Sequence, residues 1–190
     1  ILPGSRSGEL KLMLPPFLEA ARLIAEQESN VEFLIPYPRE TLKPILEVAL
    51  ADYPQLSVKL LPGAARTVLQ ASDAALVKSG TSTLEAMFLR RPMVVSYRMG
   101  TFSYQIAKRL MRSPYVALPN ILLNEMQVPE LLQYEGTPVK LAHALLTELR
   151  RAREEPDYFR AFERIHGQLR CRADVTAARA VIRLLGVGSS

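Results

Sequence analysis

Short apolar runs alternate with helical patterns along the first 111 residues of the chain. The runs predict buried strands, because each is shorter than a typical helix and is bounded by proline, glycine or polar residues. We expect strands at residues 31–36, 57–61, 73–77 and 92–97, and the end of another at Ile1–Leu2. We expect helices near residues 15–27, 39–51, 65–71, 81–90 and 102–111. This alternation with short links predicts an α/β fold in which helices cover both faces of a parallel sheet.

Prolines and a change of rhythm set the remaining boundaries. The first helix is expected to begin near Pro15 and Pro16, because proline is best tolerated in a first helical turn. After Tyr115 we expect a short strand at residues 116–120 and a short helix at residues 128–133. Three further helices are expected at residues 137–154, 156–170 and 174–185.

A hydroxyl-rich turn follows the expected strand at residues 73–77. It consists of Ser79, Gly80, Thr81, Ser82 and Thr83. A strand that turns directly into a helix leaves backbone N–H groups unpaired, and the helix dipole adds partial positive charge, so this turn suits a phosphate. Glu85 lies one turn into the helix, where its carboxylate could accept hydrogen bonds from the two hydroxyls of a ribose. The alternative is a capping box of Ser82 and Glu85, which needs no ligand.

A second glycine-flanked turn, at residues 4–8, also follows a strand and precedes a helix. In a parallel sheet, ligands lie at the carboxyl ends of the strands, near the point where the strand order reverses. Both turns leave their strands at that end. We therefore expect them to face one cleft, although about 75 residues separate them.

Composition narrows the class of protein. The 190 residues are 48% hydrophobic and 23% charged, which is typical of a soluble globular protein. The net charge of +5 is mild, and no aromatic residues interleave with basic ones as a nucleic-acid platform requires, so no nucleic-acid partner is expected. The single cysteine, Cys171, excludes a disulfide framework and a thiolate metal site, and the two histidines lack ligand spacing. No metal or cofactor is expected.

The chain contains no run of 18 apolar residues and no visible signal peptide. It begins with Ile1 rather than methionine, inside an expected strand. We therefore expect it to be a piece of a longer protein.

Taken together, the motifs resemble those of lipid A disaccharide synthase. The resemblance is carried by Leu2-Pro3-Gly4-Ser5-Arg6 with Glu9, by Ser79-Gly80-Thr81 with Leu84-Glu85-Ala86, by Pro92-Met93-Val94-Val95 with Tyr97-Arg98, by Leu118-Pro119-Asn120, and by residues 128–133. They occur in family order over essentially the whole chain. The chain is similar to the carboxyl-terminal half of that enzyme.

The resemblance implies one half of a GT-B glycosyltransferase, which is built from two facing Rossmann-like domains. The family transfers 2,3-diacylglucosamine from UDP to 2,3-diacylglucosamine 1-phosphate with inversion and without a metal. It works at the cytoplasmic face of the inner membrane of Gram-negative bacteria. Residues 1–155 would form the nucleotide-sugar-binding domain, and the helices of residues 156–190 would pack on the N-terminal domain or on a second subunit.

The resemblance also implies roles for individual residues. Arg6, with the amides of Gly4 and Ser5, would contact the diphosphate of UDP, and Ser79, Gly80, Thr81 and Ser82 would cradle it. Glu85 would hold the ribose. Asn120 would place its amide in the cleft, Glu130 and Gln133 would orient the nearby loop, and Gln133 could also reach the ligand. The alternatives are a surface arginine at Arg6 and a turn residue at Asn120.

Two features separate this chain from the complete family pattern. Many family members have Gly-Arg shortly after the Leu-Pro-Asn motif, where this chain has Asn124-Glu125. The general base that an inverting transfer needs would come from the N-terminal domain, so no catalytic residue is assigned here. We expect the 190 residues alone to bind UDP weakly and to catalyse nothing.

Two surfaces suggest further partners. An apolar stripe of Val175, Ala178, Val181, Ile182 and Leu185 could pair with the N-terminal domain or with a second copy. A mixture of basic and apolar residues suits a membrane surface and an acylated substrate: Arg90, Arg91, Arg98, Met99, Phe102, Tyr104, Lys108, Arg109, Met111 and Arg112. The alternative is a solvated helix face over ordinary core residues.

Two other functions stay open from the sequence. One is a different UDP-sugar enzyme of the GT-B type, such as a UDP-N-acetylglucosamine epimerase. The other is a non-catalytic α/β module that binds a membrane or a partner protein, and failure to bind any uridine nucleotide would favour it.

Overall fold

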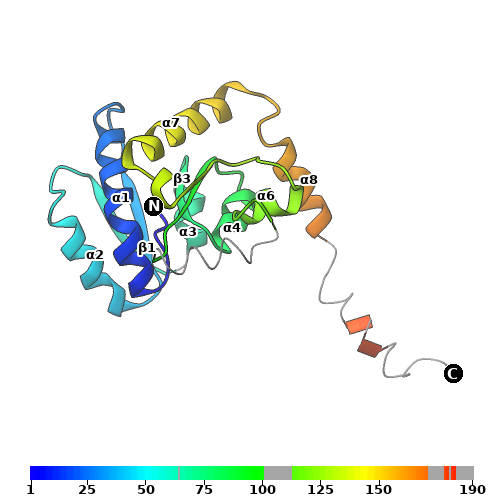
Figure 1. The fold of residues 1–190 in the computed structure, drawn as a ribbon, viewed down its shortest axis with the longest axis horizontal. Helices are drawn as coiled ribbons and strands as arrows, with labels where there is room; N and C mark the ends of the chain where they lie inside the picture. Colours follow the sequence, from blue (N-terminus) through cyan, green and yellow to red (C-terminus); the bar gives the residue numbers. More distant parts are fainter. Residues whose placement is uncertain (64, 101–112, 171–177, 180, 183–190) are drawn as a thin grey trace.

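The structure, a computed structural model, describes residues 1–63, 65–100, 113–170, 178–179 and 181–182. Its helices are α1 (Ser7–Ala25), η1 (Glu40–Leu42), α2 (Lys43–Leu50), α3 (Ala65–Ala71), α4 (Ser82–Phe88), α6 (Leu118–Leu123), η2 (Gln133–Glu135), α7 (Pro138–Glu154) and α8 (Arg160–Leu169). Its strands are β1 (Phe33–Tyr37), β2 (Val58–Pro62), β3 (Ala75–Lys78), β4 (Met93–Tyr97) and β5 (Glu130–Leu132). Figure 1 shows their arrangement.

The strands form two parallel sheets, one of β1 and β2 and the other of β3, β4 and β5 in that order. The Ile1–Leu2 segment connects them. The backbone nitrogen of Ile1 donates to the carbonyl of Leu34 at 2.8 Å, and Leu2 forms a parallel bridge with Val77. The order from edge to edge is therefore β2, β1, Ile1–Leu2, β3, β4, β5. Counted along the chain this is 3-2-1-4-5-6, the order of a doubly wound Rossmann fold.

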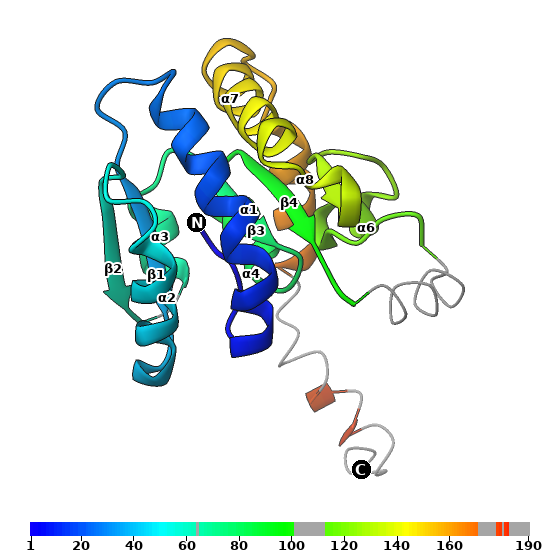
Figure 2. The ribbon, with the colours of Figure 1, turned by 60° about the vertical axis from the view of Figure 1, so that its left-hand side comes forward.

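Helices cover both faces of this sheet, as predicted (Figure 2). One hydrophobic core joins α1, α2 and α7 to β1 and to Leu76 and Val94. A second core joins α3, α4 and α8 to Val77 and Val95, which point to the opposite face. Residues 93–96 of β4 are all buried, because a central parallel strand has helices on both sides. The fold places the carboxyl ends of the strands at one open edge.

Helix α1 begins at Ser7, so the prediction that it begins near Pro15 is wrong. Two prolines inside a helix each cost about 3 kcal/mol. The side chains of Leu10, Met13 and Leu14, which lie before the prolines, are each only 1% exposed. Burial of such a side chain contributes about 1.5–3 kcal/mol, and more apolar residues follow on the same face, so packing outweighs the prolines. The longer helix brings its N-terminus to the open edge of the sheet.

Two predictions for the segment after Tyr115 are also wrong. The expected strand at residues 116–120 is not formed: Ala117 is the N-cap of α6, and residues 118–120 are its first turn, where Pro119 is tolerated. The expected helix at residues 128–133 is instead β5 followed by η2. Pairing with β4, in which Val95 lies opposite Glu130, overrides the local helical pattern.

The predicted helices at residues 137–154 and 156–170 correspond to α7 and α8. Thr137 caps α7 by accepting a hydrogen bond from the amide of Lys140. The predicted helix at residues 102–111 lies outside the described residues, as does most of the one at residues 174–185.

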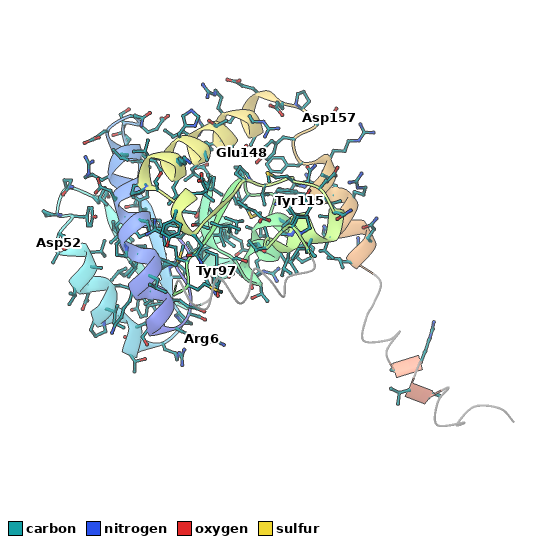
Figure 3. The ribbon with its side chains drawn as sticks, viewed as in Figure 1. Arg6, Asp52, Tyr97, Tyr115, Glu148 and Asp157 are labelled. Atoms are coloured by element: carbon teal, nitrogen blue, oxygen red, sulfur yellow. The ribbon has the colours of Figure 1, made fainter. Side chains whose placement is uncertain are left out.

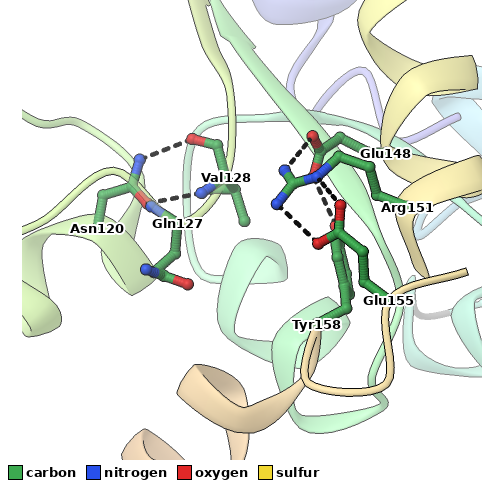
Figure 4. Close-up of polar contacts among 7 residues, drawn as sticks. All are labelled: Asn120, Gln127, Val128, Glu148, Arg151, Glu155 and Tyr158. Carbon is green, nitrogen blue, oxygen red and sulfur yellow. Dashed lines mark hydrogen bonds and ion pairs between the residues drawn. The ribbon is translucent and has the colours of Figure 1, made fainter.

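A polar network joins α7 to the segment that leads into α8 (Figure 4). Arg151 binds Glu148 at 2.9 Å and Glu155 at 2.8 Å. The Tyr158 hydroxyl donates to Glu148 at 2.7 Å. Burial raises the pKa of Tyr158, and its bond to the Glu148 carboxylate raises the pKa further, so the phenol remains a donor at neutral pH. The network holds the segment before α8 against α7, at the domain boundary predicted after residue 155.

Helix α8 packs on the same domain as the sheet. Phe162 and Ile165 are 2% and 1% exposed and belong to the core formed with Met87 of α4. The residues beyond Arg170 are largely outside the described part of the chain. Their packing on another domain or subunit stays a prediction.

We expect Phe162→Ala to lower the free energy of unfolding by about 3–5 kcal/mol, because it leaves a cavity in this core. Urea-induced unfolding measures the change. Phe88→Ala, which removes a ring that is 37% exposed, is the matched control and should cost much less. An unchanged unfolding midpoint for Phe162→Ala would mean that α8 does not pack here in solution.

Candidate functional site

A pocket of about 400 Å³ lies at the carboxyl ends of the strands, where the strand order reverses. Residues 2–6 and Glu9 line one side, and residues 78–82 and Glu85 line the other. The wall is completed by Pro36 and Pro38 at the end of β1, by Gly63 after β2 and by Ala65 at the start of α3. The two glycine-containing turns therefore face one pocket, as the sequence predicts. Figure 3 shows Arg6 at this edge, on the loop before α1.

The first loop is folded around the carboxylate of Glu9. Gly4 has φ of +124°, a conformation that side chains disfavour, and a Cβ added there would lie 2.5 Å from Glu9 Oε2. The same oxygen accepts from the Ser5 amide at 2.9 Å, and Arg39 donates to the Ser5 carbonyl at 2.7 Å. Arg6 points outward with 79% of its side chain exposed. The loop is thus held firmly, while its arginine makes only a 3.8 Å ion pair with Glu9 and is accessible to a ligand.

Lys78 connects the two sides of the pocket. Its Nζ donates to Glu9 Oε1 at 3.0 Å and lies 5.0 Å from the centre of the Tyr97 ring. Partial burial alone would raise the pKa of Glu9, but the bonds from Ser5 and Lys78 and the charges of Lys78 and Arg6 lower it below its ordinary value. The Glu9 carboxylate is therefore ionised at neutral pH.

The second loop has free donors. The amides of Gly80, Thr81 and Ser82 form no hydrogen bond with any residue that the structure describes. The hydroxyls of Ser79 and Thr83 are used within the protein, by the carbonyls of Val116 and Gly80. An anion could therefore bind the amides of residues 80–82 and the hydroxyls of Thr81 and Ser82.

Glu85 carries an unused acceptor. The helix α4 has Thr81 at its N-cap with no side-chain capping bond, so the Ser82–Glu85 capping box is not formed. The Oε2 atom of Glu85 is buried and has no hydrogen-bond partner among the described residues. A buried carboxylate oxygen without a partner is costly, which favours a ligand that donates to it.

Asn120 does not line the pocket. It is 0% exposed, and its Nδ2 donates to the Val128 carbonyl at 2.9 Å and to Glu130 at 2.8 Å. Its Oδ1 accepts from the amides of Gln127 and Val128 at 2.8 and 2.9 Å (Figure 4). Its donors and acceptors are satisfied internally, so the structure gives it the role of bracing the loop after α6.

The remaining predicted residues support the same loop. Glu130 accepts from the amides of Val116 and Ala117, which agrees with its predicted orienting role. Gln133, which has φ of +50°, contacts the backbone of Met99 and does not line the pocket. Asn124 ends α6 in a left-handed conformation, and Glu125 pairs with Arg164 at 2.8 Å. The departure from the family pattern thus leaves this loop without a cation directed at the pocket.

The pocket combines cations, free amides and one unpaired carboxylate oxygen. Such a set suits a ligand that carries both phosphate and vicinal hydroxyls. Neither Glu9 nor Lys78 was predicted to belong to the site, although Glu9 belongs to the first motif and Lys78 directly precedes the second. Their signal was a charged residue beside each glycine-containing turn.

Comparison with known proteins decides the family. The profile described as lipid-A-disaccharide synthetase matches residues 1–181. The chain belongs to this family. Lipid-A-disaccharide synthases of Burkholderia vietnamiensis and Escherichia coli are each 42% identical over 185 residues, which is 97% of this chain and 48% of the relative. That of Hahella chejuensis is 41% identical over 193 residues.

The chain spans about half the length of these lipid-A-disaccharide synthases. Within the described residues, no helix is both long and apolar enough to span a bilayer. The family assignment confirms the resemblance seen in the motifs.

Proposed function

We propose that this chain is the UDP-binding, carboxyl-terminal half of a lipid-A-disaccharide synthase. The observation that carries the proposal is the pocket where strand order reverses. The wall of this pocket of about 400 Å³ contains residues 80–82, whose amides are free among the described residues, Arg6, and Glu85, whose buried Oε2 has no hydrogen-bond partner there. That arrangement matches the two chemical parts of a nucleoside diphosphate.

Each part of the ligand would meet a different group. The diphosphate would accept from the amides of Gly80, Thr81 and Ser82, with Arg6 closing over it from the opposite loop. The ribose hydroxyls would donate to Glu85. Because the loops are already held by internal bonds, little reorganisation would accompany binding.

The same groups would serve the transfer reaction. When the bond between the sugar and UDP breaks, negative charge develops on the diphosphate, and Arg6 and the amides would stabilise it. The whole enzyme would transfer 2,3-diacylglucosamine from UDP to 2,3-diacylglucosamine 1-phosphate. The general base that accepts the proton of the acceptor hydroxyl would belong to the N-terminal half, so the 190 residues alone would be inactive.

Location and assembly are also part of the proposal. The enzyme would act at the cytoplasmic face of the inner membrane as a peripheral protein, alone or as a homodimer. Arg90, Arg91 and Arg98 bind Glu163, Gln70 and Gly136 within the chain, so they serve packing at least in part. The other members of the proposed membrane surface, apart from Met99, lie outside the described residues.

Arg6→Ala tests the proposal. In the full-length protein we expect it to weaken UDP binding by about 10-fold, which is the worth of one charge-assisted hydrogen bond, and to lower transferase activity. UMP binding should change less, because the second phosphate is absent. Isothermal titration and a transferase assay measure these effects.

The matched control is Arg150→Ala, which removes an exposed arginine from α7, outside the pocket. Thermal unfolding should be unchanged in both variants, because Arg6 makes only a 3.8 Å ion pair and is mostly in water. Full activity and unchanged UDP affinity in Arg6→Ala would contradict the proposed diphosphate site.

A further inference from the structure

Lys78 is a shielded cation in the wall of the pocket. Its side chain is only 17% exposed, against 79% for Arg6. An ammonium has three N–H groups, and within the described residues only one hydrogen bond uses them, the one to Glu9. Two N–H groups therefore remain for a ligand. Because the charge is partly removed from water, its interaction with an anion is screened less than that of Arg6.

The position of Lys78 is fixed from two sides. Glu9 holds its ammonium at 3.0 Å, and the same carboxylate is held by the Ser5 amide under Gly4. The ring of Tyr97 lies 5.0 Å from the nitrogen and stabilises it by a cation–π contact. A side chain fixed before binding loses less entropy when a ligand arrives than a free one does. Lys78 should therefore lose less side-chain entropy than Arg6 when it binds phosphate.

We infer that Lys78 is a phosphate-binding residue of this pocket and that Glu9 is the residue that positions it. The inference rests on the proposed function and adds a residue to it. In the bound state Lys78 keeps its bond to Glu9 and donates a remaining N–H to the diphosphate. Lys78 then supplies charge from the end of β3, between the two loops.

Direct contact and mere bracing of the loops have different consequences. If Lys78 touches phosphate, its loss weakens UDP more than UMP and leaves uridine almost unaffected. If Lys78 only holds Glu9 and the first loop, its loss acts on UDP through Arg6, so Lys78→Met should cost nothing further in an Arg6→Ala background. If Lys78 touches phosphate, Lys78→Met should weaken UDP binding in that background too. The ligand series shows whether the loss concerns phosphate, and the Arg6→Ala background separates the two roles.

The test is Lys78→Met in the full-length protein, titrated with UDP, UMP and uridine. NMR shifts report the weaker ligands at millimolar concentration. We expect a loss of about 10- to 100-fold for UDP and less than about 3-fold for uridine. Lys78→Arg should retain most of the UDP affinity. Lys59→Met, which removes a lysine that is 63% exposed on β2, is the matched control and should change neither.

A double variant removes a second explanation. Lys78→Met leaves the Glu9 carboxylate without its cation, and that carboxylate could repel the phosphate. In Lys78→Met with Glu9→Gln the repulsion is absent, so continued weak UDP binding supports direct contact, and full recovery overturns it. Equal losses for UDP and uridine, or an unchanged UDP affinity, would also overturn it. A full-length protein without any affinity for UDP would instead overturn the proposed function itself.

Discussion

Glu85→Ala is expected to weaken the binding of UDP to the full-length protein by about 10- to 100-fold without destabilising the fold. The loss follows from removing a carboxylate that would accept from the ribose, and bonds to charged groups are the stronger ones. Stability should be kept because the Oε2 atom has no hydrogen-bond partner among the described residues. Isothermal titration and thermal unfolding measure the two quantities.

A change in the ligand sharpens this prediction. If Glu85 binds the ribose, 2′-deoxy-UDP should already lack one of the bonds, so Glu85→Ala should cost less with it than with UDP. Glu154→Ala, an exposed carboxylate on α7, is the matched control. Equal losses for UDP and 2′-deoxy-UDP would argue against a bond to the 2′-hydroxyl.

Asn120→Ala, unlike Glu85→Ala, is expected to cause a large loss of stability. Four hydrogen bonds end on this buried amide, and their removal leaves backbone groups of Gln127 and Val128 unpaired. At about 1 kcal/mol for each bond, with a further penalty for the unpaired groups, the free energy of unfolding should fall by about 3–5 kcal/mol. Urea-induced unfolding of the chain measures it.

Asn120→Asp is the more specific variant of the same site. It keeps the shape and the acceptor oxygen but sets a second carboxylate where the amide lies 2.8 Å from Glu130. The two like charges raise the pKa of the new group, so the variant should be least stable at neutral pH and recover part of its loss as the pH falls. Unchanged unfolding with weakened UDP binding would instead give Asn120 the ligand-contacting role that the sequence predicts.

The pocket formed by the two glycine-containing turns was predictable, because it follows from the local pattern of each turn and from the geometry of a parallel sheet. A strand that turns into a helix exposes amides wherever it occurs, and parallel strands bring their carboxyl ends to one edge. The residues around Gly4 and Gly80 therefore meet in one pocket, although they are far apart in the chain. The contact between Glu9 and Lys78 was not predictable in this way, because it depends on how two side chains are oriented and not only on where the strands end.

The errors share a different cause, which is packing. The rule for Pro15 and Pro16 concerns a single helix, and burial of Leu10, Met13 and Leu14 overrides it. The pattern at residues 128–133 is helical, yet Glu130–Leu132 pairs with the edge of β4 and forms a strand. Asn120 could not be placed from sequence either, because its four partners come from a loop whose path depends on that strand.

A UDP titration followed by backbone amide shifts, on the 190-residue chain and on the full-length protein, tests whether this pocket binds UDP. We expect shifts clustered at residues 4–9 and 78–85, weak in the chain alone and saturating at lower concentration in the full-length protein. We expect no comparable cluster around Asn120. Shifts centred elsewhere, or none at millimolar UDP in the full-length protein, would contradict the assignment of this pocket to UDP.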